Sequence, residues 1–306
     1  LHAAYGLAEL ALGMMQARRL LRRVAPAAVV GFGGYPSVPT MLAAAQLGLP
    51  TLIHEQNAVL GRANRLLAPR ARCIATGFAA TQGLRAADRN RVVHTGNPVR
   101  PAIRGVGSAG YAPPGDEIEL LVFGGSQGAR VFGEVVPPAL ALLPADMRKR
   151  LHVSQQARPE DKDVVVAQYA KLAIDATIES FFTDMPDRLN RAHLVVCRSG
   201  ASTLAELAAA GRPAILVPYP HAMDDHQNAN AAEFAKSGGG WTIAQPEFTS
   251  PALSARLASL FGTPAELTAA AASSRAFARD DAAEHLAGLV QNLAVGNNRN
   301  PLERAA

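Results

Sequence analysis

Short apolar runs rich in β-branched residues alternate along the chain with longer segments in which Ala and Leu recur at helical spacing. We expect ten strands, at AVVGF (28–32), PTLIH (50–54), RCIAT (72–76), RVVHT (91–95), IELLVF (118–123), LHVS (151–154), ATIES (176–180), LVVC (194–197), AILVP (214–218) and GWTIA (240–244). Apolar strands separated by helices indicate parallel sheets that are covered by helices on both faces. The pattern therefore predicts an α/β protein.

One segment interrupts this alternation. Residues 104–117 (RGVGSAGYAPPGDE) are rich in Gly and Pro and lack periodicity, which is typical of a connection between domains. We therefore expect a first domain at 1–115 and a second at 116–295, both doubly wound like a Rossmann fold and facing each other across a cleft. Crossing helices should occupy residues 250–295, and the polar tail at 296–306 should be disordered.

The composition is that of a globular protein, with 49% apolar and 18% charged residues and no apolar run long enough to span a bilayer. Thirty Lys and Arg residues against 25 Asp and Glu give a net charge of +5, and much of the excess lies in the first third. This asymmetry indicates an anionic partner but is too small to require nucleic acid. Cys73 and Cys197 each lie beside an apolar run, as buried thiols do in a reducing compartment.

A glycine-rich turn follows the fifth expected strand. Residues 124–130 (GGSQGAR) lie between that strand and a helix, where Gly lets the backbone approach a phosphate and the helix start offers free N–H groups. The same letters match the nucleophile elbow of α/β-hydrolases, with Ser126 as the nucleophile and Asp184 and His221 or His226 following in the expected order. The chain has no HGGG-like oxyanion segment, which argues against a hydrolase. A purely structural turn is the third interpretation.

A second turn, at 197–206 (CRSGASTLAE), joins a strand to a helix in the same half of the chain. Thr203 and Glu206 have the spacing of a capping box, in which Thr caps the helix and Glu reaches back to free N–H groups. Two glycine-bearing helix starts in one parallel sheet also converge on the crevice where ligands bind. Glu206 is therefore a candidate acceptor for sugar hydroxyls, like the acid of a dinucleotide fold.

Polar residues also gather after the second expected strand. The segment HEQNAVLGRANR (54–65) places His54 and Glu55 at the strand end, where either could take a proton from a hydroxyl. The preceding turn, GFGGYP (31–36), is not a G-x-G-x-x-G fingerprint because Pro36 stands at its last position. This argues against a nicotinamide-dependent dehydrogenase.

The segment HAMDDHQNANAAEF (221–234) follows the ninth expected strand. Its Asp-Asp-His run (224–226) could be read as a metal site, but acids in the first turn of a solvated helix are the more ordinary explanation. Gln227 and Asn230 lie three residues apart on one helix face, where both can hydrogen-bond to a sugar.

The first helical segment, MMQARRLLRRVAP (14–26), carries Arg18, Arg19, Arg22 and Arg23 among leucines and methionines. This is the composition of a helix that lies on a membrane surface. A helix with one solvated basic face would have the same composition, so both interpretations stay open.

Seven segments, taken in order, resemble the MurG family of glycosyltransferases. They are GFGGYPSVPTMLAA, HEQNAVLGRANR, TGNPVR, GGSQGAR, FFTDMP, CRSGASTLAELAAAGRPAILVPYPH and DDHQNANA. Members of this family (family 28, GT-B fold) are inverting enzymes of peptidoglycan synthesis. They move N-acetylglucosamine from UDP-N-acetylglucosamine to the 4-hydroxyl of undecaprenyl-diphosphate-linked N-acetylmuramyl pentapeptide. The resemblance implies a peripheral enzyme at the cytoplasmic face of the bacterial inner membrane that needs no cofactor or metal and binds no nucleic acid.

The resemblance also implies a donor site, mostly in the second domain. Its members are Arg100 and Ser126 at UDP, the backbone of Phe182 at uracil, the turn formed by Ala201, Ser202, Thr203, Leu204, Ala205 and Glu206 around the nucleotide, and Gln227, Asn230 and Asn57 at N-acetylglucosamine. Glu206 would accept from the ribose hydroxyls.

On the acceptor side, the resemblance implies Tyr35, His54, Glu55 and Asn64. Inverting transfer needs a base that deprotonates the acceptor hydroxyl while UDP leaves from the opposite face of the sugar. His54 is the first candidate for this base and Glu55 the second.

The chain departs from the family pattern in one respect. Family members begin with a glycine-rich GGTGGH loop, whereas this sequence starts at Leu1 inside a helical pattern. We therefore expect a fragment whose first strands are missing and whose activity on its own is doubtful. The alternatives are another GT-B enzyme acting on UDP-sugars, such as an epimerase or a natural-product glycosyltransferase, the hydrolase with Ser126, and a chain that binds nucleotide without turnover.

Overall fold

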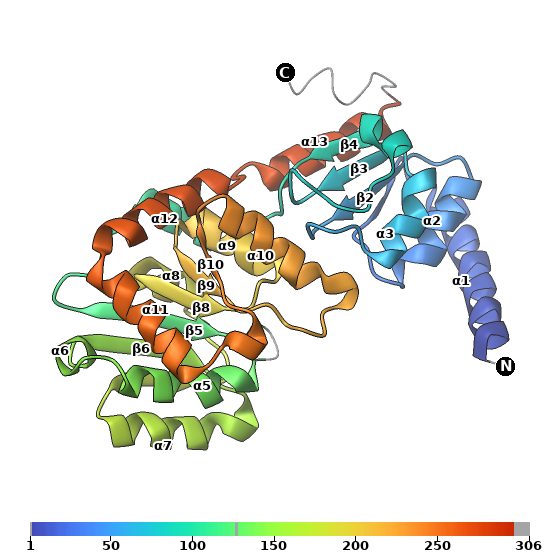
Figure 1. Cartoon of the computed structure of the whole chain (residues 1–306). Coiled ribbons are helices and arrows are strands. Elements are labelled where there is room, and N and C mark those ends of the chain that lie inside the picture. The colour runs from blue at the N-terminus through green and yellow to red at the C-terminus, as the bar shows by residue number, and fades with distance from the viewer. Residues whose placement is uncertain (1, 126–127, 297–306) are drawn as a thin grey trace. The chain divides into compact units, whose positions relative to one another are not determined.

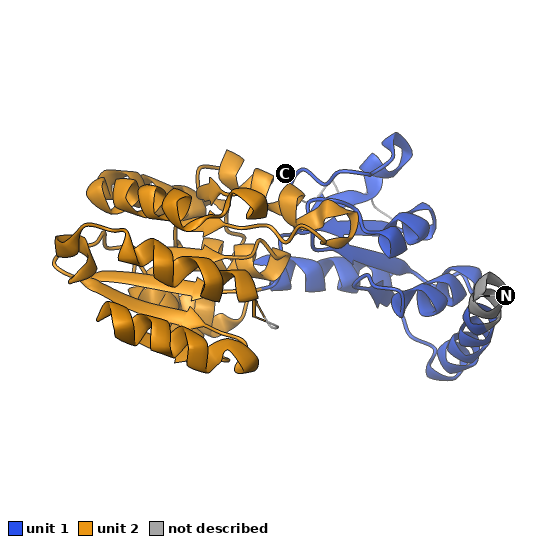
Figure 2. Ribbon diagram, turned by 60° about the horizontal axis from the view of Figure 1, so that its bottom comes forward, with its two compact units in different colours: residues 1–98, 281–306 blue, residues 99–280 orange. Residues whose placement is uncertain are grey.

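The chain forms two compact α/β units. The computed structural model describes residues 2–125 and 128–296 (Figure 1). Unit 1 comprises residues 1–98 and 281–306, and unit 2 comprises residues 99–280 (Figure 2). The chain thus passes from unit 1 to unit 2 before the Gly- and Pro-rich segment in which the sequence placed the boundary, and it returns to unit 1 at Asp281. The polar tail at 297–306 lies outside the described residues.

Every one of the ten apolar runs forms a strand, so this part of the prediction is confirmed. The strands are β1 (Val29–Gly31), β2 (Thr51–Glu55), β3 (Cys73–Thr76), β4 (Val92–His94), β5 (Ile118–Phe123), β6 (Leu151–Gln156), β7 (Asp175–Glu179), β8 (Leu194–Cys197), β9 (Ala214–Leu216) and β10 (Gly240–Thr242). All of their pairings are parallel.

Helices connect and cover these strands. The α-helices are α1 (His2–Val24), α2 (Ser37–Gln46), α3 (Arg62–Leu67), α4 (Pro101–Ser108), α5 (Arg130–Ala141), α6 (Ala145–Arg148), α7 (Lys162–Leu172), α8 (Met185–Arg191), α9 (Ala201–Ala210), α10 (His226–Lys236), α11 (Ser250–Gly262), α12 (Pro264–Phe277) and α13 (Ala282–Ala294). Short 3-10 turns are η1 (Ala68–Arg70), η2 (Ala86–Arg91), η3 (Pro159–Asp161), η4 (Met223–Asp225) and η5 (Gln245–Glu247).

Unit 1 has a sheet with the order β1-β2-β3-β4. Ile53 and Ile74 point to one face, where they pack with Met41 of α2 and Leu67 of α3. Leu52, the neighbour of Ile53, points to the other face and belongs to the cluster that includes α13. Alternate residues of a strand face opposite sides of the sheet, so both faces are covered and the strands are largely apolar.

Unit 2 has a sheet with the order β10-β9-β8-β5-β6-β7. Numbered within the unit, this is the 3-2-1-4-5-6 order of dinucleotide-binding folds, and the order reverses between β5 and β8. Helices α5, α7 and α11 pack together over one face, and α4, α8, α9 and α12 form a second packed group (Figure 1). In such sheets ligands bind outside the carboxyl ends of the strands at the reversal point.

Helix α1 packs chiefly against α2. Ala17 and Leu21 are buried with Ala43 and Ala44 of α2. Within the described residues no helix is both long and apolar enough to cross a membrane.

Candidate functional site

Two glycine-bearing turns follow the strands at the reversal point of the unit 2 sheet. The turn after β5 is tight at Gly124, where a Cβ atom would lie 2.4 Å from the backbone nitrogen of Ala129. Gly128 has a φ of +68°, and a Cβ there would lie 2.9 Å from Cγ of Arg158. Both positions therefore need Gly. Gly128 packs against Arg158, which belongs to the segment that follows β6. Ser126, at the centre of this turn, lies outside the described residues.

The turn after β8 starts α9 differently from the prediction. The N-cap of α9 is Gly200, with no side-chain capping bond, and Thr203 lies inside the first turn. The predicted capping box of Thr203 and Glu206 is therefore wrong. The helix begins at Ala201, two residues before Thr203, so the first N–H groups of α9 belong to the small residues that follow Gly200, and no side chain caps them.

Glu206 bonds to Arg100 instead of to the helix start. Its Oε1 accepts from Nε of Arg100 at 3.1 Å and from Nη2 at 2.9 Å. Arg100 precedes α4, and its side chain is 62% exposed against 21% for Glu206. The structure thus brings together two residues that the sequence assigned to the nucleotide, although they are 106 positions apart along the chain. The other carboxylate oxygen of Glu206, Oε2, lies outside this pair.

The loop after β7 is ordered around Phe182. Phe181 is exposed, whereas Phe182 is buried and its ring lies 4.1 Å from the guanidinium of Arg188. Arg188 also donates to Asp184 at 2.9 Å and to Oγ of Ser154 at 2.6 Å. The guanidinium of Arg188 holds the pKa of Asp184 below its usual value. With the ring of Phe182 fixed in this way, its backbone has one defined position.

Arg198, the first residue after β8, was missed by the sequence analysis. It is buried, lies between the rings of Phe132 and Tyr219, and donates to the carbonyls of Val217 and Pro218. Burial lowers the pKa of Arg198 because it penalises the charged form. Its role is to fix the loop after β9, which leads to α10.

Gln227 and Asn230 are held from this same turn. Oγ of Ser199 donates to the backbone oxygen of Gln227 at 2.8 Å, and Nδ2 of Asn230 donates to the backbone oxygen of Ser199 at 3.1 Å. The Oε1 of Gln227 accepts from the backbone N–H of Tyr219 at 2.9 Å. Gln227 is partly exposed and Asn230 is fully buried. Since a backbone N–H can only donate, the amide orientation of Gln227 is fixed, and its Nε2 is the group left to face a ligand.

In unit 1, His54 uses both ring nitrogens in internal hydrogen bonds. The amide nitrogen of Gln56 lies 3.1 Å from Nδ1 of His54 and also donates to the carbonyl of Phe32, so Nδ1 is an acceptor. Nε2 then carries the proton and donates to the carbonyl of Gly96 at 3.1 Å. Burial lowers the pKa of His54 below 6.5, which keeps the ring neutral. This geometry favours a role in holding the loops after β2 and β4.

Glu55 is buried and organises the loop that follows β2. Its two oxygens accept from N and Nδ2 of Asn57, from N of Gly61 and from Nδ2 of Asn64, at 2.8 to 3.2 Å. The structure thus brings together three of the residues that the sequence grouped here. Oδ1 of Asn64 is buried without a hydrogen-bond partner.

Tyr35 stands apart from this cluster. Its side chain is exposed in the turn formed by Gly33 and Gly34, which both have positive φ. The ring that reaches His54 is that of Phe32, with centroids 5.9 Å apart.

The arrangement of a hydrolase triad is not present in the described part of the chain. Asp184 pairs with Arg188, while Nδ1 of His226 lies 2.7 Å from the carbonyl of Met223 and His221 contacts the ring of Tyr219. Neither histidine is bonded to Asp184. Among the described residues, Asp, Glu, His and Cys also form no group of three or more suited to a metal ion.

Gln156 is a second residue that the sequence analysis missed. It ends β6, is 6% exposed, and bonds to the backbone of both neighbouring loops. An uncharged amide at a strand end does not stand out in the sequence. The position of Gln156 at the end of a strand was the only feature that could have indicated its place at this edge of the sheet.

The GT-B glycosyltransferases have two α/β units, each built on a parallel sheet. This chain has the same architecture, with glycine-bearing helix starts at the reversal point of the larger sheet. The model of the glycosyltransferase family 28 N-terminal domain matches residues 6–76, and that of the family 28 C-terminal domain matches residues 119–286. The chain belongs to glycosyltransferase family 28.

Three similar proteins illustrate this relation. A Rhodospirillum centenum protein named UDP-N-acetylglucosamine--N-acetylmuramyl-(pentapeptide) pyrophosphoryl-undecaprenol N-acetylglucosamine transferase is 56% identical over 295 residues, which are 95% of this chain and 78% of that protein. The crystal structure of MurG from Acinetobacter baumannii has a TM-score of 0.76 at 34% identity and covers 91% of this chain and 78% of its own. A UDP-GlcNAc 2-epimerase from Neisseria meningitidis has a TM-score of 0.64 at 11% identity, with 92% and 80% covered, and shares the fold alone.

Proposed function

We propose that the chain transfers N-acetylglucosamine from UDP-N-acetylglucosamine to undecaprenyl-diphosphate-linked N-acetylmuramyl pentapeptide, a step of peptidoglycan and cell-wall synthesis. The observation that carries this proposal is the 56% identity over 295 residues with a protein named for that reaction. The A. baumannii structure, at 34% identity, supports it.

The UDP part of the donor would bind at the reversal point of the unit 2 sheet. The start of α9 has no side-chain capping bond and follows β8, which is the neighbour of β5 in the sheet, and Arg100 pairs with Glu206 of α9. These groups would take the negative charge that develops on the leaving diphosphate. The oxygen of Glu206 that lies outside the Arg100 pair is our proposed acceptor for the ribose hydroxyls.

The sugar would bind at the Nε2 group of Gln227. Because Tyr219 holds Oε1, Gln227 presents N–H groups that pair with lone pairs of sugar hydroxyl or acetamido oxygens. Asn230 is fully buried and bonded to Ser199, so in this structure it supports the start of α10. For Asn230 to hold the sugar as well, its amide would have to become accessible.

Inverting transfer also needs a base, and the structure sets a condition on both candidates. His54 is neutral, as a base must be, but each ring nitrogen has a partner. Glu55 accepts four hydrogen bonds from its own loop. Either residue would have to release a partner before it could accept the proton of the sugar hydroxyl.

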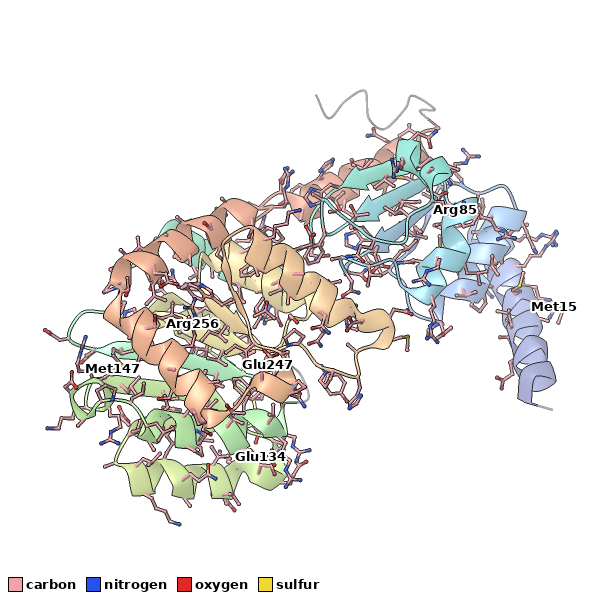
Figure 3. The ribbon with its side chains drawn as sticks, in the orientation of Figure 1. Met15, Arg85, Glu134, Met147, Glu247 and Arg256 are labelled. Carbon is pink, nitrogen blue, oxygen red and sulfur yellow. The ribbon has the colours of Figure 1, made fainter. Side chains whose placement is uncertain are left out.

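Unit 1 would contact the anionic membrane that carries the acceptor. Leu12, Met15, Leu20 and Val24 are exposed on α1, and the four arginines of this helix, Arg18, Arg19, Arg22 and Arg23, are exposed too. Figure 3 shows Met15 pointing away from the body of unit 1. Basic residues beside exposed apolar ones are suited to the surface of the cytoplasmic leaflet.

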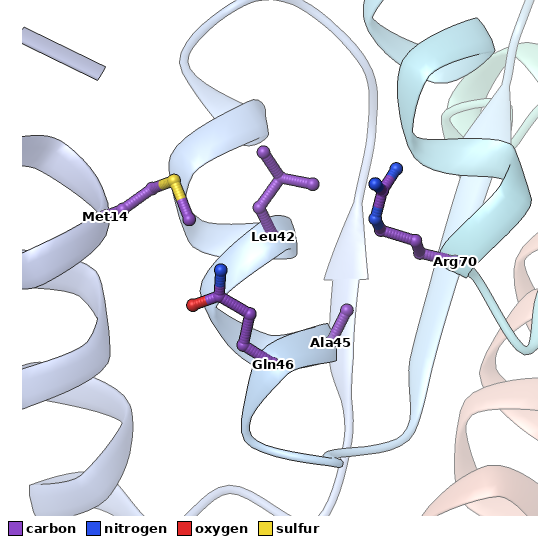
Figure 4. Close-up of a pocket in the computed structure, with 5 residues that line it drawn as sticks. All are labelled: Met14, Leu42, Ala45, Gln46 and Arg70. Carbon is purple, nitrogen blue, oxygen red and sulfur yellow. The ribbon is translucent and has the colours of Figure 1, made fainter. Parts of the chain in front are cut away.

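A hollow of about 420 Å³ lies beside this helix. It is lined by Met14 of α1, Leu42, Ala45 and Gln46 of α2, and Arg70 of η1 (Figure 4). Its lining combines apolar side chains with the amide of Gln46 and the guanidinium of Arg70, as the α1 surface combines apolar and basic residues, which supports membrane contact on this side of unit 1.

The test is a transfer assay with radiolabelled UDP-N-acetylglucosamine and a polyprenyl-diphosphate muramyl pentapeptide in detergent. We expect the label to move to the lipid, and we expect UDP to bind in calorimetry and to inhibit the transfer. Release of an epimerised UDP-sugar without transfer would identify an epimerase. Absence of both UDP binding and transfer would refute the proposal.

A further inference from the structure

Gln156 connects two loops that lie on either side of it at the carboxyl edge of the unit 2 sheet. β6 lies between β5 and β7. Gln156 is the last residue of β6, so its side chain lies between the turn that follows β5 and the loop that follows β7. It is buried, with 6% of its surface exposed.

Both hydrogen bonds of this side chain are to the backbone. Oε1 accepts from the N–H of Gly124 at 3.1 Å, and Nε2 donates to the carbonyl of Ser180 at 3.1 Å. One partner can only donate and the other can only accept, so the amide cannot flip. A single side chain therefore fixes the distance between Gly124 and Ser180.

Described residues of both segments have further contacts besides those with Gln156. The glycine turn also packs on Arg158, which is held by Asp161 at 2.7 Å. The β7 loop is fixed two residues further on, where Arg188 covers Phe182. Gln156 thus links by hydrogen bonds two segments that each have other supporting contacts.

We propose that Gln156 is a positioning residue that couples recognition of the nucleotide base to recognition of the diphosphate. This inference rests on the proposed function and on the donor site that the family resemblance implies, in which the turn after β5 approaches a phosphate of UDP and the backbone of Phe182 reads uracil. The span between base and diphosphate in a nucleotide is limited by its covalent structure. The two loops must therefore keep a matching separation, and Gln156 sets it.

The first experiment is calorimetric titration of UDP and CDP into the wild-type protein and the Gln156→Glu variant. The variant keeps an oxygen for the N–H of Gly124 but places a second oxygen against the carbonyl of Ser180. We expect the preference for UDP over CDP to fall by about tenfold, the value of one hydrogen bond. KM for UDP-N-acetylglucosamine should rise while kcat changes less than about threefold, because the loss is in binding the ground state and transition state alike.

The matched control is Gln155→Met. Gln155 is the neighbouring residue on the same strand and is fully buried, but its Oε1 accepts from the hydroxyl of Tyr169 on α7. This variant should lose stability without changing the UDP-to-CDP preference. A purely structural role for Gln156 would make both variants behave in this same way, and that result would overturn the proposal.

A second measurement uses the wild-type protein and does not depend on the folding of a variant. Uridine lacks the diphosphate, so it can engage only the β7 loop and the ribose contacts. We expect uridine to slow hydrogen exchange at the amide of Gly124, which Gln156 bonds. Unchanged exchange at Gly124 with bound uridine would contradict the coupling, whereas failure of the wild-type protein to bind UDP at all would refute the proposed function instead.

Discussion

At the scale of the residue, the ion pair of Glu206 and Arg100 leads to a direct test of the nucleotide site. Glu206→Gln should leave α9 intact, because the helix is capped by Gly200 without a side-chain bond. UDP affinity should fall by about tenfold, since a charged acceptor for hydroxyls is lost. The measurement is calorimetric titration with UDP, alongside circular dichroism.

The matched control for this variant is Glu266→Gln. Glu266 pairs with Arg256 at 3.0 Å on the α11 and α12 helices, and Figure 3 labels Arg256. The Glu266→Gln variant also removes one carboxylate from an ion pair with Arg, but it keeps Glu206. Its UDP affinity should therefore match that of the wild type. Equal affinities in all three proteins would show that Glu206 serves only the ion pair.

The buried His54 predicts how stability depends on pH. Burial lowers the pKa of His54 below its ordinary value of 6.5. As the pH falls below 6.5, His54 becomes protonated in the unfolded chain while it stays neutral in the folded chain. The free energy of unfolding therefore falls. The slope is at most about 1.4 kcal/mol per pH unit for one group.

Denaturant unfolding at pH 7.5 and at pH 5.5 measures this loss of stability. His54→Gln cannot titrate and should show a smaller loss between the two pH values than the wild type. His193, whose pKa burial also lowers, should contribute the dependence that persists in this variant. An identical pH dependence in both proteins would contradict the assignment to His54.

Single residues also show what the sequence could and could not predict about the site. Glu206, Glu55 and Gln227 could be proposed from the sequence because polar residues at strand ends and helix starts gather at the edge of a parallel sheet where ligands bind. Gln156 and Arg198 were missed because their partners lie on other loops of the chain: backbone atoms for both, and the side chain of Gln245 for Arg198 as well. No pattern along the sequence encodes such a bond, since it exists only once the strand order is known.

At the scale of the element, the strands were predictable and the helix start was not. A strand buried on both faces is apolar at most of its positions, which leaves a clear signal in the sequence. The motif around Thr203 satisfies the capping-box spacing, but spacing alone does not say where a helix begins. Gly200 begins α9 earlier, in extended conformation with a φ of −64° and ψ of 145°.

Helix packing in unit 2 gives a prediction about two glycines of α4. A Cβ on Gly107 would lie 2.2 Å from the backbone oxygen of Ala209 on α9, so Gly107→Ala should force the two helices apart. The expected loss is about 1 to 3 kcal/mol of unfolding free energy. Denaturant midpoints report it.

Gly105 provides the control on the same helix. A Cβ there meets no atom within 4 Å. Gly105→Ala should stabilise the protein by about 0.5 to 1 kcal/mol, because Ala has the higher helix propensity. If the two variants shift the midpoint equally, close approach of α4 and α9 does not explain Gly107.

At the scale of the whole molecule, the charge is divided unevenly between the two units. Unit 1 has thirteen arginines against six acidic residues, while unit 2 has seventeen basic residues against nineteen acidic ones. The net charge of +5 therefore conceals one basic unit and one slightly acidic unit. The asymmetry fits the proposed contact of unit 1 with an anionic surface and the proposed binding of UDP by local groups in unit 2.

Vesicle binding tests whether the basic residues of unit 1 contact an anionic membrane. Replacing Arg18, Arg19, Arg22 and Arg23 with Ser should weaken binding to vesicles that contain phosphatidylglycerol by about a hundredfold or more, since each basic residue near such a surface contributes about 1 kcal/mol. Binding of the wild type should also weaken as salt is raised, because exposed charges are screened. Cosedimentation measures both effects.

A quadruple variant of unit 2 removes the same charge elsewhere. Lys149, Lys171, Arg191 and Lys236 are all exposed, and their replacement with Ser lowers the net charge by the same four units. If net charge alone drives the binding, the two quadruple variants will lose affinity equally. If the α1 surface is the contact, only the α1 variant will lose it, and UDP affinity in unit 2 will be unchanged in that variant because its nucleotide groups are untouched.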